Sequence, residues 1–216
     1  MPRASNTTVR RAQIVDGLLA VMAREGYERA SVARIAGASR LTPGLVHYHF
    51  ESKGEILVAL VGELERRVSQ RVEARLARVS AGAARVRLAA YVDAHLATGA
   101  GADAAAVACW VAIGAEAIRQ PEVARAYRAV LERAVDRLAA LVRAVLVEDG
   151  RATRGARAMA AAIAATIEGA YRLAAAAPGV VPAGSAAPSL VAMVDGLLAS
   201  APPAVGPKRR AKERTR

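Results

Sequence analysis

The stretch that decides the fold is residues 30–50, which read ASVARIAGASRLTPGLVHYHF. Ser31 and Thr42 each precede a short helical pattern, and serine and threonine side chains cap helix N-termini. Pro43 suits the first position of the second helix, because its fixed φ angle is already helical. Two short helices joined by a tight turn form a helix-turn-helix, which delivers the start of its second helix to the DNA major groove.

Helical periodicity extends over nearly all of the remaining chain, where apolar residues recur at every third or fourth position and no segment alternates as a strand would. This pattern predicts an all-α protein of three short helices followed by about six longer ones. Besides the two short helices, we expect helices over residues 8–25, 53–78, 86–97, 104–119, 121–150, 157–176 and 188–200. Ser52 and Glu55 have the spacing of a capping box, which marks the start of the long helix at residue 53.

The length of 216 residues allows a small DNA-binding module and a larger helical domain. We expect a three-helix domain with the helix-turn-helix over residues 1–52 and the larger helical domain over residues 53–200. Residues 201–216 begin with prolines and end in the run KRRAKERTR, so they are predicted to form a disordered basic tail. The role of this tail is open between a solvated segment that aids solubility and non-specific contact with phosphates.

The formal net charge of +12 favours a polyanionic partner, which charge alone leaves open between nucleic acid and an anionic membrane. The single cysteine, Cys109, excludes internal disulfides and cysteine metal clusters, which is compatible with the cytoplasm. Prolines and glycines interrupt the longest uncharged run, residues 173–194, so we expect no membrane-spanning helix. The sequence has no glycine-rich phosphate loop, nucleophile motif or metal-ligand cluster, so we expect no enzyme, catalytic residue, metal or cofactor.

The helix-turn-helix and the segment after it carry three motifs, which are SVxxIA from Ser31, TxGxxHYHF from Thr42 and SK at Ser52. Their order and spacing are those of the TetR family of bacterial transcription regulators, which this chain therefore resembles. The wording GLVHYHF, with CWVA at residues 109–112 and EG at residues 168–169, is similar to the BetI-type branch. The resemblance implies a homodimer that represses transcription from operator DNA and is released when a small-molecule effector binds the larger domain.

The resemblance, together with the place of each residue in the helix-turn-helix, implies a set of contacts with DNA. Thr42, Pro43 and Gly44 are expected at base edges, because the start of the second helix enters the groove. Contacts with phosphates are expected from Ser31, Arg40 and Lys53, and His47 and Tyr48 are expected either to donate to phosphates or to pack on the sugar. Arg40 stands where the family usually has glycine, so either it adopts a strained conformation or the turn is built differently. His49 is interpreted as a packing or capping residue in preference to a DNA contact.

Candidate ligand-binding residues lie on the apolar helices beyond residue 80, which carry few aromatic side chains. Aromatic faces and carboxylates attract quaternary ammonium groups, and Trp110 with Glu116 and Glu168 offers both. The full set of candidates is Tyr91, Trp110, Glu116, Tyr127, Glu168 and Tyr171. The alternative is that Trp110 belongs to the core and Glu116 is solvated. Resemblance to the BetI-type branch implies choline-like ligands.

The last two long helices are rich in alanine, and small residues let helices of two subunits approach closely enough for a four-helix interface. The family resemblance implies the same homodimer. A rival interpretation is a basic helical protein that binds RNA or membranes through charge alone. Such a protein would bind DNA without a preferred site and would lose affinity steeply with salt.

Overall fold

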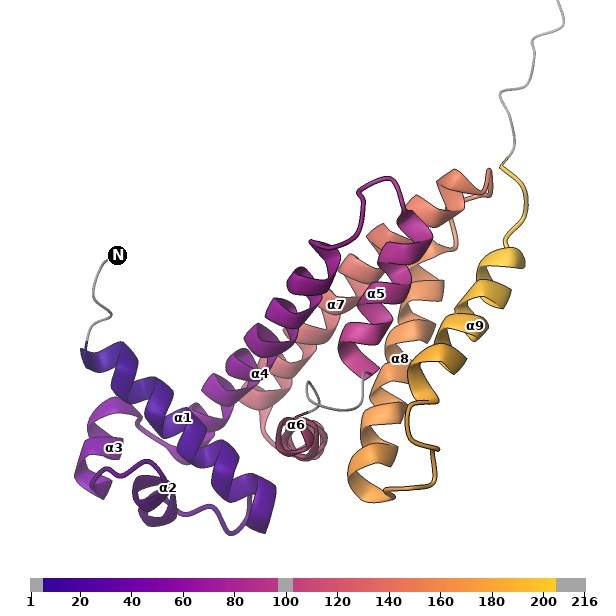
Figure 1. Ribbon diagram of the computed structural model, residues 1–216. Helices are drawn as coiled ribbons and strands as arrows, with labels where there is room; N and C mark the ends of the chain where they lie inside the picture. The colour runs from indigo at the N-terminus through magenta and orange to yellow at the C-terminus, as the bar shows by residue number, and fades with distance from the viewer. Residues whose placement is uncertain (1–5, 97–102, 205–216) are drawn as a thin grey trace, which may run out of the picture.

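The computed structural model describes residues 6–96 and 103–204, and this part of the chain contains nine helices (Figure 1). They are α1 (Asn6–Glu25), α2 (Val32–Ala38), α3 (Pro43–His49), α4 (Lys53–Leu76), α5 (Ala84–Leu96), α6 (Ala104–Ala117), α7 (Pro121–Glu148), α8 (Ala156–Ala176) and α9 (Ala186–Ala199). Within the described ranges, β pairing is limited to one isolated bridge between Arg151 and Pro203. The all-α prediction is confirmed, and the ends of the seven helices with predicted bounds lie within two residues of those bounds.

The first three helices form a small bundle at one end of the molecule (Figure 1). The side chains at its centre are at most 2% exposed and are Ile14, Leu18, Ile35, Val46 and Phe50. Helices α1 and α2 approach so closely at Gly17 that a Cβ atom there would stand 2.0 Å from Ser39 Oγ and 2.9 Å from the Ile35 carbonyl oxygen. The absence of a side chain at residue 17 therefore sets the distance between these two helices.

Two helices connect this bundle with the rest of the molecule (Figure 1). The 24-residue helix α4 leaves the bundle, where it packs against α1, and continues along α5 and α7. Helix α6, seen end-on in Figure 1, packs against α1 as well as against α7 and α8. Since α4 has contacts on both sides, the domain boundary at residue 53 stays a prediction.

Helices α7 and α8 pack along each other, and α9 packs against α5 and α8. Residues 201–204, expected to begin the basic tail, pair with the turn between α7 and α8. The Ala152 N–H donates to the Pro202 carbonyl at 2.8 Å, and the Ala204 N–H donates to the Gly150 carbonyl at 2.9 Å. The rest of the predicted tail, residues 205–216, lies outside the described residues.

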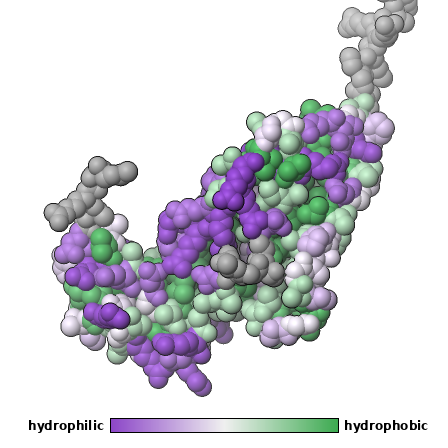
Figure 2. All heavy atoms as spheres, viewed as in Figure 1, coloured by the Kyte–Doolittle hydropathy of each residue, from purple (hydrophilic) through white to green (hydrophobic). Residues whose placement is uncertain are grey.

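The surface is unevenly polar. Figure 2 shows hydrophilic residues gathered over α4 and over parts of the α1–α3 bundle, with hydrophobic residues at the surface nearer α5 and α9. Val86 of α5 and Met193 of α9 are 56% and 61% exposed, respectively. Across the described helices, none is long and apolar enough to cross a membrane.

Candidate nucleic-acid interface and internal pocket

The helix-turn-helix is fixed by two side-chain caps. Ser31 Oγ accepts a hydrogen bond from the Arg34 N–H at 3.3 Å, and Thr42 Oγ1 accepts one from the Leu45 N–H at 3.3 Å. Pro43 occupies the first turn of α3, where a backbone N–H would have no helical partner. The two predicted caps are therefore confirmed.

Helix α3 buries one face and exposes the other. Val46 and the cap residue Phe50 are buried, whereas the predicted contact residues Thr42, Pro43, Gly44, His47 and Tyr48 are all exposed. Tyr48 is 79% exposed. His49 is half-buried, with its ring at right angles to that of Tyr48. The face that remains open is thus a short row of small, hydroxyl and aromatic groups.

The turn between α2 and α3 is built on Arg40 in the left-handed conformation, with a φ of 55°. Its N–H donates to the Gly37 carbonyl at 3.1 Å, and the next N–H, of Leu41, donates to the Ala36 carbonyl at 2.9 Å. Of the two alternatives left by the sequence, arginine at this position therefore takes the strained backbone. Left-handed φ costs a non-glycine residue about 1–2 kcal/mol. The Arg40 side chain is exposed beside α3.

Lys53 opens α4 with its ammonium held against the protein. The ammonium donates to the Tyr27 carbonyl at 3.1 Å and lies 4.1 Å from the centre of the Tyr27 ring. An ammonium has three donors, so two remain for other acceptors. Ser52 Oγ caps α4 by accepting from the Glu55 N–H at 3.1 Å, but Glu55 returns its bond to the Glu51 N–H, one residue before the position expected in a capping box.

Arg11 of α1, which was not predicted from the sequence, joins α1 to the end of α3 and to the start of α4. Its guanidinium donates to the His49 carbonyl and to Glu55 Oε1, and it lies 3.9 Å from the centre of the Phe50 ring. The bonds from the Glu51 N–H and from Arg11 lower the pKa of the Glu55 carboxyl, although its partial burial opposes the shift. The partners are 38 and 44 residues away along the chain, so no local pattern signals this contact.

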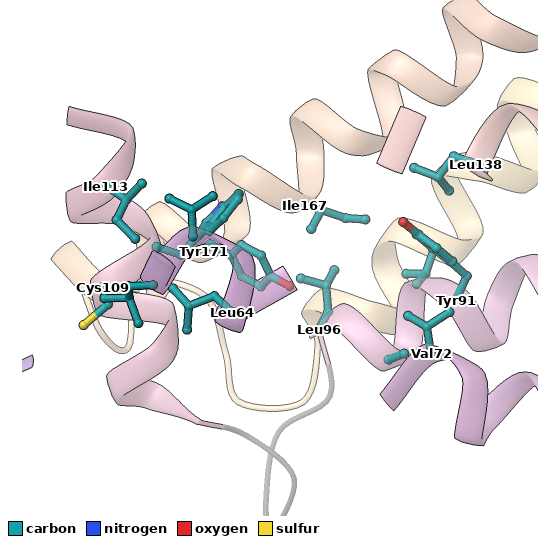
Figure 3. Close-up of a cluster of buried hydrophobic side chains, with 14 of the residues drawn as sticks. Leu64, Val72, Tyr91, Leu96, Cys109, Ile113, Leu138, Ile167 and Tyr171 are labelled. Carbon is teal, nitrogen blue, oxygen red and sulfur yellow. The ribbon is translucent and has the colours of Figure 1, made fainter. Parts of the chain in front are cut away.

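A cavity of about 250 Å³ lies among α4, α5, α6, α7 and α8. Four of the six predicted ligand-binding residues line it: Tyr91, Trp110, Glu168 and Tyr171. Figure 3 shows the neighbouring apolar cluster, with Tyr91 and Val72 at one end, Cys109 and Ile113 at the other, and Ile167 between them. Most of the exposed wall is apolar, as in other small-molecule sites, but charged side chains also line it, four of them arginines.

The polar centre of the cavity is the carboxylate of Glu168. The Trp110 indole N–H lies 3.0 Å from both Glu168 oxygens, and the Tyr127 hydroxyl donates to Oε2 at 3.0 Å. The Trp110 and Tyr127 rings are 4.7 Å apart between centres. Burial raises the pKa of the Glu168 carboxyl, and the two hydrogen bonds oppose this shift. A Cβ at Gly114 would stand 3.3 Å from the Tyr127 hydroxyl, so the glycine leaves room for the Tyr127 side chain.

His95 also lines the cavity and forms a second polar group there with Tyr171. It was not predicted from the sequence as a pocket residue. Its Nδ1 lies 2.9 Å from the Tyr171 hydroxyl, and its ring centre lies 4.7 Å from that of Tyr91. Burial, with the charges of Arg71 and Arg137, lowers the pKa of His95 to about 4. At neutral pH the imidazole is therefore uncharged.

Glu116 is the predicted candidate that the structure places elsewhere. Its side chain is buried, but it faces the end of α6, where its oxygens accept from Arg119 at 2.7 Å and from Gln120 at 2.8 Å. The interpretation of Glu116 as part of the cation site with Trp110 is thus not supported by its position. The structure also corrects the solvated alternative, because only 6% of Glu116 is exposed.

Two family models match the chain. A model of bacterial regulatory proteins of the tetR family matches residues 14–60, and a model of the C-terminal part of BetI-type transcriptional repressors matches residues 84–199, more than half of the sequence. The chain belongs to the TetR family. The predicted BetI-type resemblance is confirmed as well, and this TetR-family protein is a transcriptional regulator with a DNA-binding helix-turn-helix.

Individual relatives are similar at low identity. The HTH-type transcriptional regulator BetI of Cronobacter sakazakii is 27% identical over 140 residues, which are 65% of this chain and 69% of that protein. The regulator of the same name from Yersinia pestis is 27% identical over 125 residues, 58% of this chain and 63% of that one. A solved structure of a putative transcriptional regulator from Saccharomonospora viridis in complex with choline is 21% identical, with a TM-score of 0.71, covering 89% of this chain and 97% of that chain. It shares the fold.

Proposed function

We propose that this TetR-family regulator binds operator DNA as a homodimer through α3, and that a small cationic effector in the internal pocket releases it. The observation that carries the effector proposal is the Glu168 carboxylate, which lies in the cavity with an indole N–H and a phenol O–H as partners. Among the described residues it forms no ion pair. A carboxylate removed from water is stabilised by a cation, and adjacent aromatic faces attract quaternary ammonium groups.

The DNA proposal is supported by the open face of α3. Apart from its chain neighbours and the backbone of its own helix, Gly44 has no protein atom within 4 Å of the place a Cβ would take, so the space beside it is free for DNA. Thr42 and Tyr48 present hydroxyl groups on the same short helix, and Arg40 and Lys53 flank it with positive charge. Hydroxyl groups and cations of this kind contact base edges and phosphates.

The homodimer proposal is supported by a face of small side chains on α8 and α9. Exposed positions along α8 include Ala158, Ala161, Ala165 and Gly169. Larger apolar side chains adjoin them, since Leu173 is 41% exposed and Met193 of α9 is 61% exposed. Two such helices from each subunit would bury these side chains in a four-helix interface.

Release requires that the pocket and the DNA-binding bundle be coupled, and the contacts of α6 and α4 supply two routes. Cys109 of α6 lies one residue before the pocket residue Trp110, and its thiol is 3.5 Å from the Leu19 carbonyl of α1. Arg67 of α4 lines the pocket and pairs with Asp16 of α1. A ligand that moves α4 or α6 therefore acts directly on α1.

The experiment uses the full chain and choline as the probe. Trp110 is the single tryptophan, so its emission reports binding at Glu168. Release is measured as the loss of affinity for an operator fragment selected from a random DNA pool. Glu168→Gln should weaken choline binding by about tenfold or more, whereas the exposed acid variant Glu132→Gln should leave it unchanged. Choline that binds wild type and Glu168→Gln equally, or that saturates the protein without lowering operator affinity, would contradict the proposal.

The pH dependence gives an independent check, because choline itself does not titrate. Since the pKa of Glu168 is raised by burial, its charge is lost at a higher pH than that of an ordinary glutamate. Choline affinity should therefore fall as the pH drops through this raised pKa, and Glu168→Gln should remove that dependence.

A further inference from the structure

Arg71 of α4 lines the same pocket and lacks an internal partner. Its Nε atom is buried without a hydrogen-bond partner, and in the described part of the chain no carboxylate lies within ion-pair distance of its guanidinium. A buried donor left unsatisfied costs about 1–3 kcal/mol, and more when the group is charged. An unpaired arginine on a pocket wall is stabilised by an anion that a bound ligand supplies.

The other arginines on the pocket wall are already neutralised. Arg67 pairs with Glu63 and Asp16, at 2.7 and 2.5 Å. Arg133 pairs with Glu65 at 2.6 Å, and Arg137 pairs with Glu73 at 2.5 Å. Over the residues that the structure describes, the cavity thus presents one unpaired cation and, at Glu168, one unpaired anion.

The charges of Arg71 and Glu168 both affect Tyr171, which lines the same cavity. Burial raises the pKa of Tyr171, and the charge of Arg71 opposes that shift while the charge of Glu168 adds to it. Arg71, Glu168 and Tyr171 all line the cavity, and the Tyr171 hydroxyl contacts His95. A ligand that fills a cavity of about 250 Å³ can reach both groups at once.

We propose that the effector is a zwitterion whose carboxylate pairs with Arg71 while its cationic group faces Glu168. This inference rests on the proposed function for its cationic half and adds the anionic half. A simple cation leaves Arg71 unpaired, and a simple carboxylate leaves Glu168 unpaired and repelled. A small zwitterion satisfies both groups, and the planar guanidinium fork matches a carboxylate in two parallel hydrogen bonds.

The test compares acids with their own methyl esters. The probes are glycine betaine and its homologues with two and three methylene groups between the trimethylammonium and the carboxylate. Each methyl ester keeps the cation and removes the negative charge. At least one acid of the series should bind wild type about ten- to a hundred-fold more tightly than its ester, because charge-assisted hydrogen bonds in partly buried sites have this strength.

The variants assign that preference to Arg71. Arg71→Met should bring acid and ester to equal affinity, Arg71→Lys should keep part of the preference, and Arg128→Met, which removes an exposed arginine of α7 outside the pocket, should keep all of it. Thermal unfolding of each variant checks that the fold is retained.

The outcomes separate the two proposals. Esters and choline that bind as well as every acid, with binding lost in Glu168→Gln, would overturn the zwitterion and leave the cationic effector standing. An acid preference that survives in Arg71→Met would overturn the role of Arg71. If acids keep an Arg71-dependent preference while Glu168→Gln has no effect, the cationic half fails, and the proposed function fails with it. Failure of every acid to bind wild type would overturn the zwitterion proposal outright.

Discussion

The guanidinium of Arg67, on the wall of the pocket, lies 2.5 Å from the carboxylate of Asp16 in α1. The same guanidinium contacts Glu63 at 2.7 Å and Asp103, the N-cap of α6, at 3.6 Å. One side chain thus joins α1, α4 and α6 at the edge of the cavity. Removal of this junction should uncouple ligand binding from DNA binding without removing either.

We therefore expect Arg67→Met to keep choline affinity within about threefold while lowering the effect of saturating choline on operator affinity. Allosteric coupling is commonly 1–3 kcal/mol and is reciprocal, so the effect of operator DNA on choline affinity must shrink by the same factor. Arg66→Met is the control, because Arg66 pairs with Glu63 but does not line the pocket. Full coupling in Arg67→Met, measured in either direction, would exclude this route.

Gly44 offers a test of the DNA face that leaves the fold intact. The Cβ of an alanine at residue 44 meets no protein atom within 4 Å outside its own helix and chain neighbours. Alanine also favours helix over glycine, so the free energy of unfolding should stay equal or rise slightly. Operator affinity should fall by about tenfold or more if bases approach this position closely. Gly62→Ala on α4, where a Cβ also meets nothing, is the matched control and should bind DNA normally. Normal operator affinity in Gly44→Ala would remove Gly44 from the interface.

Lys53 and Thr42 should differ in what they contribute to DNA binding. Lys53→Met should weaken binding to all sequences alike and lower the slope of affinity against salt by about one, because a phosphate contact carries no base information. Thr42→Ser keeps the cap hydroxyl of α3 and removes only the methyl group, so it should change base preference without unfolding the helix. Affinities measured on a set of single-base operator variants over a range of salt concentrations distinguish these effects. A change of base preference in Lys53→Met would reverse the assignment.

Gly17→Ala should destabilise the bundle. The added Cβ would overlap Ser39 Oγ at 2.0 Å and the Ile35 carbonyl oxygen at 2.9 Å, which forces α1 and α2 apart. Overpacking of this kind typically costs about 1–3 kcal/mol, measurable by urea unfolding. Ser39→Gly should recover part of that loss in the double variant, because it removes the nearer contact and leaves the Ile35 carbonyl. Independent, additive effects of the two substitutions would argue against the close approach.

His95 should make the protein less stable at mildly acidic pH. Its pKa is lowered from 6.5 to about 4, so between these values the unfolded chain takes up a proton that the folded chain does not. The free energy of unfolding of wild type, relative to that of His95→Gln, should therefore fall by up to about 3 kcal/mol as the pH drops from about 7 to about 4. Chemical unfolding of both proteins across this range gives the difference directly. A constant difference would show that His95 titrates normally.

The elements predicted best from the sequence are those specified by neighbouring residues. Ser31, Thr42 and Ser52 cap helices as expected, because a cap is decided within three residues along the chain. The clamp of Arg11 on Glu55 and the close approach of Gly17 to Ser39 were not predictable, since each joins residues far apart in sequence.

The pocket shows the same limit more sharply. Glu116 and Glu168 both lie on apolar helices and gave equal grounds for assignment to a cation site. The orientation in which α6 and α8 pack against neighbouring helices places Glu168 in the cavity and Glu116 beside Arg119. Arg71 and His95 carry no local pattern that marks them as pocket residues, and only the packing of α4 and α5 brings them there.

Helix α4 is long enough to extend from the pocket to the DNA-binding bundle. Arg71 and Lys53 lie 18 residues apart on this one straight helix, a separation of about 27 Å at 1.5 Å per residue. A tilt of roughly 5° about the pocket end moves the other end by about 2 Å, close to the length of a hydrogen bond. We therefore expect α4 to act as a lever, so that a ligand that shifts the pocket by a fraction of an ångström misaligns the DNA-binding bundle at the far end of the helix.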